Sequence, residues 1–168
     1  MTIKHLAIKE FLNMVLIPVN FRIGRVFTTP TIAGLFLTKK CNSRCTICEY
    51  WKIKDFSDEL TKEEWFSVID ELKKASIKLI NFTADGEILT RRDAFEIMEY
   101  AKEQRFLISL NTNGLNLDGN ISSIIELDPF QVQVSLDTFR DQPNHYAWVV
   151  LGGFTKVLNG LTALKNAG

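Results

Sequence analysis

Short apolar runs alternate along this chain with longer segments whose apolar residues recur at helical spacing. Because the runs are short and bounded by turn-forming or charged residues, they predict buried strands. The predicted strands span residues 32–38, 77–83, 106–112 and 131–136. Each strand is followed by a loop and then by a segment typical of a helix.

The clearest helix signal begins at Thr61, where Glu64 stands three residues later and completes a capping box. The apolar residues that follow share one helix face, namely Trp65, Val68, Ile69 and Leu72. Further helices are expected from Thr90 and Asp93 onward (stripe Phe95, Met98, Ala101), over residues 121–127 before Asp128-Pro129, and after Gly153. Strand and helix thus alternate, which predicts an α/β fold with a parallel sheet and right-handed crossovers.

The first 29 residues precede this alternation and predict a helical extension, with the core expected over residues 30–168. The longest charge-free stretch within the first 25 residues, residues 11–21, is interrupted by polar residues and proline, and it is too short for the ~20 apolar residues of a membrane span. We expect the extension to cover one end of the fold. The alternative is an interfacial anchor, because basic residues flank the stretch: Lys4, Lys9, Arg22 and Arg25.

Charge and cysteine content narrow the functional classes. Lys plus Arg and Asp plus Glu both number 20 in 168 residues, so nothing indicates a nucleic-acid partner, which needs a clustered basic surface. The cysteines number three and lie between positions 41 and 48. An odd, clustered set is a poor disulfide framework and fits a reducing compartment and a metal site. We therefore expect a cytoplasmic protein.

The cysteine segment reads Cys41-Asn42-Ser43-Arg44-Cys45-Thr46-Ile47-Cys48 and follows the first predicted strand. Thiolates are soft ligands that suit iron–sulfur clusters and zinc. Three cysteines would leave one iron of a four-iron cluster open for another molecule, whereas an electron-transfer cluster takes a fourth cysteine. A zinc site would need His5 or His145, both distant in sequence, and inert buried thiols are disfavoured by the polar residues between them.

The other unusual residues also fall where strands end: Asp85-Gly86-Glu87, Asn113-Gly114 and Asp137. In parallel α/β folds the ligand site lies beyond the carboxyl ends of the strands. With these residues in this order, the C-x-x-x-C-x-x-C loop resembles that of the radical S-adenosylmethionine superfamily, and the resemblance runs from about Ile32 to the end of the chain. It implies the N-terminal part of a partial TIM-type barrel: a parallel (β/α)4 half, where family cores usually have six units.

The resemblance implies a [4Fe-4S] cluster held by Cys41, Cys45 and Cys48, with S-adenosylmethionine as second cofactor. Asp85, Gly86 and Glu87 stand where the family has a Gly-Gly-Glu turn that contacts the methionine amino group, although a plain turn also explains them. The remaining cofactor-binding residues that it implies are Ile47 beside the adenine, Asn111 and Asn113 after the third strand, and Ser135 and Asp137 after the fourth.

The implied reaction is reductive cleavage of S-adenosylmethionine to a 5′-deoxyadenosyl radical that abstracts hydrogen from an unknown small-molecule or peptide substrate, with an electron donor as partner. No acid–base residue is assigned to this step. The alternatives are a non-catalytic iron–sulfur or zinc module, and a half-barrel subunit that needs a partner chain. Such a partner, or a second copy, is expected at the edge of the fourth strand.

Overall fold

The computed structural model describes residues 3–136, 150 and 152–167. The principal helices and strands are α1 (Ile3–Ile23), β1 (Ile32–Phe36), α2 (Lys62–Lys74), β2 (Leu79–Thr83), α3 (Ala94–Glu103), β3 (Leu107–Thr112), α4 (Ile121–Leu127), β4 (Gln131–Val134) and α5 (Gly153–Ala167). Short 3-10 turns add η1 (Tyr50–Lys52), η2 (Ile88–Thr90) and η3 (Asp118–Asn120).

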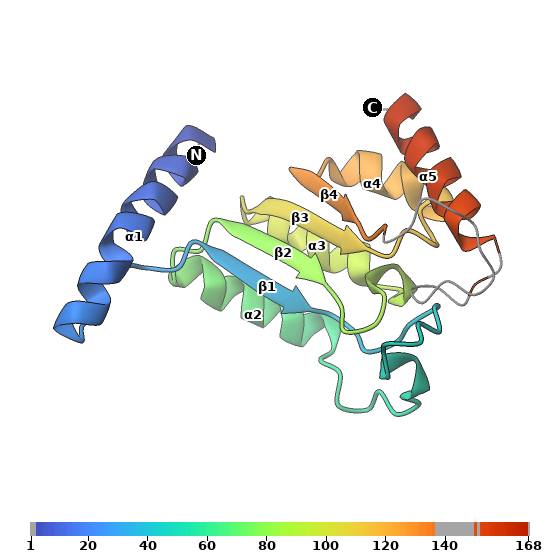
Figure 1. Ribbon diagram of the computed structural model, residues 1–168, viewed down its shortest axis with the longest axis horizontal. Helices are drawn as coiled ribbons and strands as arrows, with labels where there is room; N and C mark the ends of the chain where they lie inside the picture. The colour runs from blue at the N-terminus through green and yellow to red at the C-terminus, as the bar shows by residue number, and fades with distance from the viewer. Residues whose placement is uncertain (1–2, 137–149, 151, 168) are drawn as a thin grey trace.

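Within the described residues, the strands form one parallel sheet in the order β1-β2-β3-β4. Helices α2 and α3 lie against one face of it, and all strand arrows in Figure 1 point toward the loop that follows β1. This arrangement confirms the predicted parallel (β/α)4 unit. The carboxyl ends of all these strands therefore meet at one edge.

The core lies between the sheet and its helices. Ile80 and Phe82 of β2 point toward that side and are fully buried. They pack in one cluster with Ile69 of α2 and Ile97 of α3, also fully buried. Successive side chains of a strand point to opposite faces. Ile80 and Phe82 therefore lie on the same face of β2, and the helices cover this face.

The opposite face of the sheet carries a group of polar, uncharged side chains among apolar ones. Asn81, Ser109 and Gln131 stand in register across β2, β3 and β4, and Asn111 stands beside Gln133 one step further along. Parallel sheets are normally apolar on both faces because helices cover both. The polar residues here indicate a face that meets water or a ligand instead.

Several boundaries differ from the sequence prediction. β1 ends at Phe36 and not at residue 38, β2 begins at Leu79 and not at residue 77, and β3 begins at Leu107 and not at residue 106. The third helix begins at Ala94, after η2, and Asp93 makes no side-chain bond to the helix start. Its carboxylate instead accepts hydrogen bonds from Arg91, at 2.7 Å from Nε. The fourth strand ends at Val134, whereas we expected it to reach Leu136.

We expected the N-terminal helix to cover one end of the fold, but its apolar side chains do not pack against the sheet. α1 stands apart from the sheet in Figure 1, and large apolar residues such as Phe11, Met14 and Phe21 are exposed. The helix instead uses polar side chains to hold residues 27–29, the irregular segment that leads to β1.

The capping box of α2 gives a direct stability test. The Thr61 side chain accepts from the Glu64 N–H at 3.3 Å, and the Glu64 carboxylate accepts from the Thr61 N–H at 2.7 Å. Thr61→Ala should lower the free energy of unfolding by about 1 kcal/mol in urea titrations, because the Glu64 N–H loses its partner. Ser67→Ala, exposed on the same helix, should be close to neutral. Equal effects of the two changes would contradict the role given to the cap.

Candidate functional site

The cysteine loop leaves β1 at the carboxyl edge of the sheet, and all three thiols are half-buried. Local bonds shape the loop: the Ser43 N–H donates to Cys41 Sγ at 3.4 Å, and the Cys48 N–H donates to the Cys45 carbonyl at 3.3 Å. The Trp51 indole N–H also donates to the Cys45 carbonyl, at 3.2 Å. A cavity of about 230 Å³ opens beside it, lined by Cys41, Asn42, Ser43, Arg44, Trp51 and Lys54.

The donor set of this loop is chemically suited to an iron–sulfur cluster. Among the described residues, no three His, Cys, Asp or Glu side chains converge closely enough to hold one metal ion. In a cluster each thiolate takes a different iron, so three soft ligands on one polar loop fit that larger group.

Burial raises the pKa of the Cys41 thiol, and the hydrogen bond from the Ser43 N–H lowers this pKa by a smaller amount. The nearby carboxylate of Glu87 and the other two thiols raise it further. Cys41 is therefore protonated at neutral pH without a metal, and a metal that binds there must displace the proton.

The turn after β2 is joined directly to the base of the cysteine loop. The Gly86 N–H donates to the Thr38 carbonyl at 3.2 Å, and the Glu87 N–H donates to the Lys40 carbonyl at 2.7 Å. A Cβ on Gly86 would overlap the carbonyl group of Lys40, so only glycine fits at this position. The predicted acidic turn and the cysteine loop thus form one unit.

Glu87 lies inside this unit, and its side chain is only 2% exposed. Its carboxylate accepts from the Thr112 hydroxyl and the Asn113 N–H, each at 2.6 Å, and from the Leu89 N–H at 3.1 Å. Burial raises the pKa of Glu87, while these donors lower it. Sequence reasoning placed Glu87 at a ligand; the described geometry shows it bridging the ends of β2 and β3.

Asn113 connects the end of β3 to the cysteine loop. Its side-chain amide donates to Asn42 Oδ1 at 2.8 Å, and its own Oδ1 accepts from the Leu115 N–H at 3.0 Å. Gly114, which follows, has φ +81°, and a Cβ there would press against Val134 and Val157. On the apolar side, Cys45 packs against a cluster formed by Leu115 and Val157.

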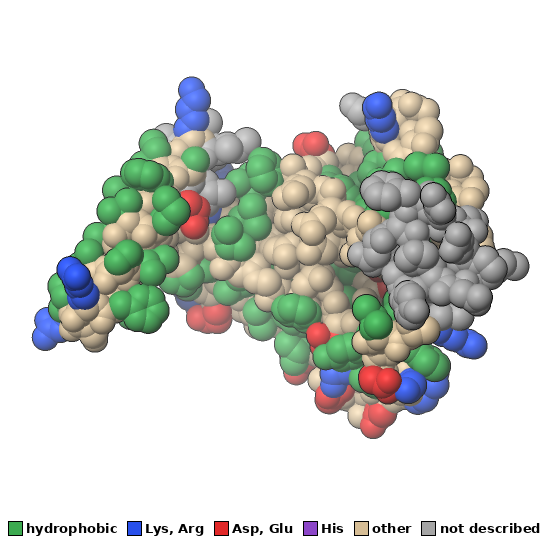
Figure 2. Space-filling view, viewed as in Figure 1, with side chains coloured by type: hydrophobic (Ala, Val, Ile, Leu, Met, Phe, Trp, Pro, Cys, Tyr) green, Lys and Arg blue, Asp and Glu red, His purple; other side chains and the backbone are tan. Residues whose placement is uncertain are grey.

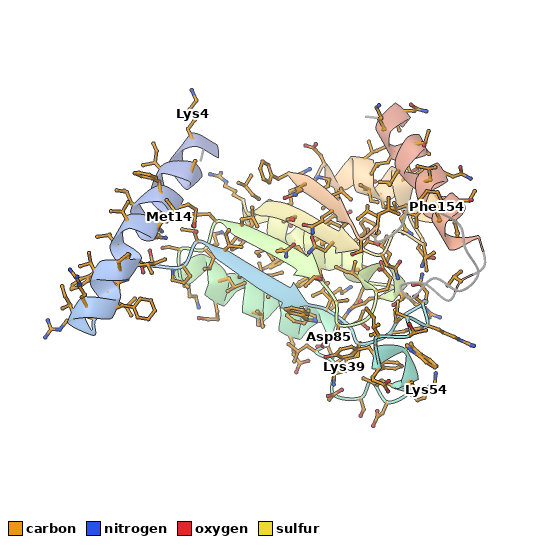
Figure 3. All side chains as sticks on the ribbon, viewed as in Figure 1. Lys4, Met14, Lys39, Lys54, Asp85 and Phe154 are labelled. Atoms are coloured by element: carbon orange, nitrogen blue, oxygen red, sulfur yellow. The ribbon has the colours of Figure 1, made fainter. Side chains whose placement is uncertain are left out.

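The remaining predicted residues differ in exposure. Ile47 is 82% exposed, and Asp85 is half-buried beside Gly86. Asn111 is half-buried with an Oδ1 that is buried and has no hydrogen-bond partner among the described residues. Figure 3 shows Asp85 and Lys39 close to the loop after β1.

Two predicted residues follow β4. Ser135 is exposed, and its N–H donates to the Thr112 carbonyl at 3.0 Å. Asp137 lies outside the described residues.

A family model of the Radical SAM superfamily matches residues 35–168. The chain belongs to this superfamily. It is 33% identical over 139 residues to a probable GTP 3′,8-cyclase of Archaeoglobus fulgidus, covering 82% of this chain and 45% of the relative. It is 32% identical over 135 residues to an Fe-coproporphyrin III synthase of Methanosarcina barkeri, covering 79% and 33%. The chain thus spans less than half the length of these curated relatives.

The fold is similar to that of Streptococcus suis SuiB bound to S-adenosylmethionine, with a TM-score of 0.69, 14% sequence identity, and coverage of 82% of this chain and 32% of SuiB. Membership in the Radical SAM superfamily implies a [4Fe-4S] cluster and S-adenosylmethionine as cofactors. The family's enzymes use small-molecule or peptide substrates and an electron donor. The resemblance inferred from the cysteine spacing is confirmed.

The contact between Gly86 and Lys40 can be tested with a matched pair of glycine substitutions. Gly86→Ala should lower the free energy of unfolding by about 1–3 kcal/mol, because the added methyl group must push the turn away from the cysteine loop. Gly119→Ala places its methyl group in open space and should change stability by less than about 1 kcal/mol. Urea titration of both variants checks this, and a neutral Gly86→Ala would contradict the close approach.

The buried carboxylate predicts a pH dependence. Because the pKa of Glu87 is raised in the folded state, the native protein binds more protons than the unfolded chain above the ordinary value of 4.5. Stability contributed by this group is therefore lost as pH rises from about 4.5 through the raised pKa. Glu87→Gln removes the titrating group and with it this pH dependence. The free energy of unfolding of the wild type, relative to that of the variant, should therefore fall as pH rises.

Urea unfolding of metal-free protein between about pH 4.5 and pH 7.5 measures this difference. Glu126→Gln, on an exposed position of α4, is the matched control. Parallel stability curves for wild type and Glu87→Gln would show that burial does not govern this carboxyl.

Proposed function

We propose that this chain binds a [4Fe-4S] cluster through Cys41, Cys45 and Cys48 and S-adenosylmethionine across the carboxyl edge of the sheet, as a radical S-adenosylmethionine enzyme. The main support is that one hydrogen-bonded unit joins the cysteine loop to the turns after β2 and β3. When bound, the two cofactors supply one-electron cleavage of a carbon–sulfur bond and hydrogen abstraction from a substrate. The chain's own residues bind, orient and exclude water.

The groups around the loop suit the methionine end of such a cofactor. The Asp85 carboxylate and the carbonyls of the Asp85-Gly86 turn can accept from an ammonium group. Asn111 offers a buried Oδ1 that has no hydrogen-bond partner among the described residues, and Ser135 offers an exposed hydroxyl. Glu87 acts here as a positioning residue, because its oxygens already accept from Thr112, Leu89 and Asn113.

Asp85 departs from the family pattern, which has a glycine at this position. Its carboxylate adds charge beside the turn, but its side chain also narrows the approach to the backbone. Ile47 lies between two of the cysteines and is 82% exposed, so it can form an apolar wall for an adenine ring.

The uncharged face of the sheet supports a substrate region next to the cofactors. Asn81, Ser109 and Gln131 present amides and a hydroxyl there, without a charge to select an ion. Such groups hydrogen-bond a neutral polar molecule.

One observation favours a second candidate, an activity that depends on a further strand. In the described part of the chain, β4 pairs with β3 on one side and has no partner strand on the other. That edge presents N–H and C=O groups that a strand from this or another chain can meet. Light scattering of the purified chain measures whether it associates.

The cluster assignment predicts the effect of removing each thiol. Anaerobic reconstitution of the wild type with iron and sulfide should give about four irons per chain. Cys41→Ala, Cys45→Ala or Cys48→Ala should abolish the four-iron signal in electron paramagnetic resonance spectra of the reduced protein. Ser57→Ala, exposed and outside the loop, should reconstitute like the wild type. Stoichiometric iron in the triple alanine variant would refute the assignment.

Catalysis is tested separately from cluster binding. Addition of S-adenosylmethionine should perturb the spectrum of the reduced cluster, and 5′-deoxyadenosine should accumulate under reducing conditions. A reconstituted cluster that does neither would identify a non-catalytic iron–sulfur module.

A further inference from the structure

Helix α1 carries its apolar side chains on the outside. Phe11, Met14 and Phe21 are 60%, 62% and 85% exposed, and Leu12 and Val15 are each 52% exposed. Figure 2 shows hydrophobic side chains along the length of this helix. Scattered exposed apolar residues are ordinary, but a contiguous band of this kind marks an interaction surface.

The polar side chains of α1 point the other way, toward the protein's own chain. Asn13 donates to the Thr29 carbonyl at 3.1 Å. Asn20 donates to the Thr28 hydroxyl and accepts from the Phe27 N–H, both at 3.0 Å. Glu10, Asn13 and Asn20 fall on one helical stripe that faces this segment, while exposed apolar side chains surround the rest of the helix.

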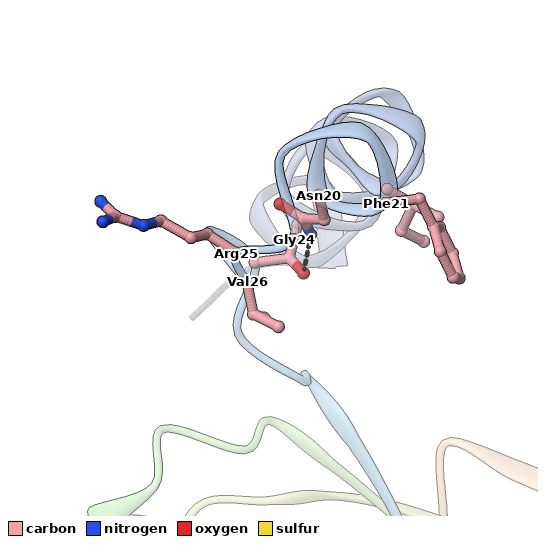
Figure 4. A pocket seen from close by; sticks show the side chains of 7 residues that line it. Asn20, Phe21, Gly24, Arg25 and Val26 are labelled. Carbon is pink, nitrogen blue, oxygen red and sulfur yellow. Dashed lines mark hydrogen bonds between the residues drawn. The ribbon is translucent and has the colours of Figure 1, made fainter.

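Cavities remain between the helix and the segment that it holds. One of about 320 Å³ is lined by residues that include Ile17, Phe21 and Val26. Figure 4 shows Asn20 beside this segment and Phe21 pointing away from Arg25 and Val26. Among the described residues, the hydrogen bonds of Asn13 and Asn20 attach α1 to this segment.

The charged residues around the apolar band are mostly positive. Lys4, Lys9, Arg22 and Arg25 flank it, and Glu10 is the single acid among residues 1–25. Glu10 is half-buried and has one carboxylate oxygen shielded from solvent, so it belongs to the inward stripe. Residues 1–25 carry a formal charge of +3, and the remainder carries −3. The outward face thus offers apolar side chains with cations at both ends.

This pattern distinguishes between two kinds of occupant. Two copies of α1 packed face to face would bring the cations of one helix beside those of the other, in either orientation, without exposed acids to pair with them. Juxtaposed like charges disfavour such an interface. An anionic lipid surface meets both features at once, because the apolar residues enter the acyl boundary and the cations meet the headgroups.

We propose that α1 is an interfacial helix that lies on an anionic lipid surface, with Phe11, Leu12, Met14, Val15 and Phe21 inserted. Among the helices described, none combines the length and apolarity needed to cross a bilayer, which fits a helix that lies in the surface plane. α1 joins the amino end of β1, whereas the cysteine loop follows its carboxyl end (Figure 1). The cofactor site therefore faces away from the lipid.

Vesicle flotation of the full chain tests the proposal. The wild type should float with vesicles of phosphatidylcholine containing about a third phosphatidylserine and remain behind with pure phosphatidylcholine. The combined change Phe11→Gln, Leu12→Gln and Val15→Gln keeps good helix formers and should abolish flotation. Arg22→Gln with Arg25→Gln should weaken partition roughly 30-fold, since each cation near an anionic surface contributes roughly fivefold.

The matched control is Ile125→Gln with Phe130→Gln, which removes exposed apolar residues outside α1 and should float like the wild type. Equal flotation with neutral vesicles, or no flotation at all, would overturn the proposal. So would an α1-dependent dimer in light scattering without vesicle binding, which would identify a second copy as the occupant.

A second measurement does not depend on disruptive variants. Phe21→Trp replaces the most exposed of these aromatic residues with another, so the fold should tolerate it. Brominated acyl chains in anionic vesicles should quench the fluorescence of the new tryptophan, so the variant should lose more fluorescence than the wild type does. An unquenched signal would place the residue outside the bilayer and overturn the proposal.

Discussion

The close approach between Gly86 and the backbone of Lys39 and Lys40 determines how the cysteine loop leaves the sheet. Because no side chain separates the two segments, the turn after β2 and the start of the loop lie in direct contact. The hydrogen bonds from Gly86 and Glu87 to this segment depend on that contact. Thiols on a polar loop would otherwise have little to orient them relative to the strand ends.

The buried carboxylate of Glu87 extends the same constraint to β3. A charged group away from water is unfavourable unless donors meet it, and here a hydroxyl and two backbone N–H groups do so. Removing any donor would leave the carboxylate poorly satisfied, so the turns can shift only together. Burial of the Glu87 carboxylate is unfavourable, but its hydrogen bonds hold the turns after β2 and β3 in one arrangement. Such an arrangement is typical of sites that hold a ligand in a defined place.

The sequence allowed most of the framework to be predicted. The strands, the capping box at Thr61 and the convergence of unusual residues at the strand ends follow from periodicity and from the direction of parallel strands. Asp93 flanks the start of α3, as predicted, but its side chain does not cap the helix, because its carboxylate accepts from Arg91. The bridging position of Glu87 was missed because its partners, Thr112 and Asn113, are distant in sequence. Only tertiary contacts reveal which polar groups meet inside a protein.

The misjudged orientation of α1 has a related cause. A run of apolar residues predicts burial, but it does not say whether the protein or its surroundings cover them. Asn13 and Asn20 decide this in the described structure, because their amides bond the segment before β1 and turn the apolar residues outward. Parallel strands then separate the two ends of the molecule: the apolar helix joins the amino end of β1, and the thiols lie at its carboxyl end. The lipid contact proposed for α1 therefore leaves the carboxyl edge of the sheet, with its thiols, facing solution.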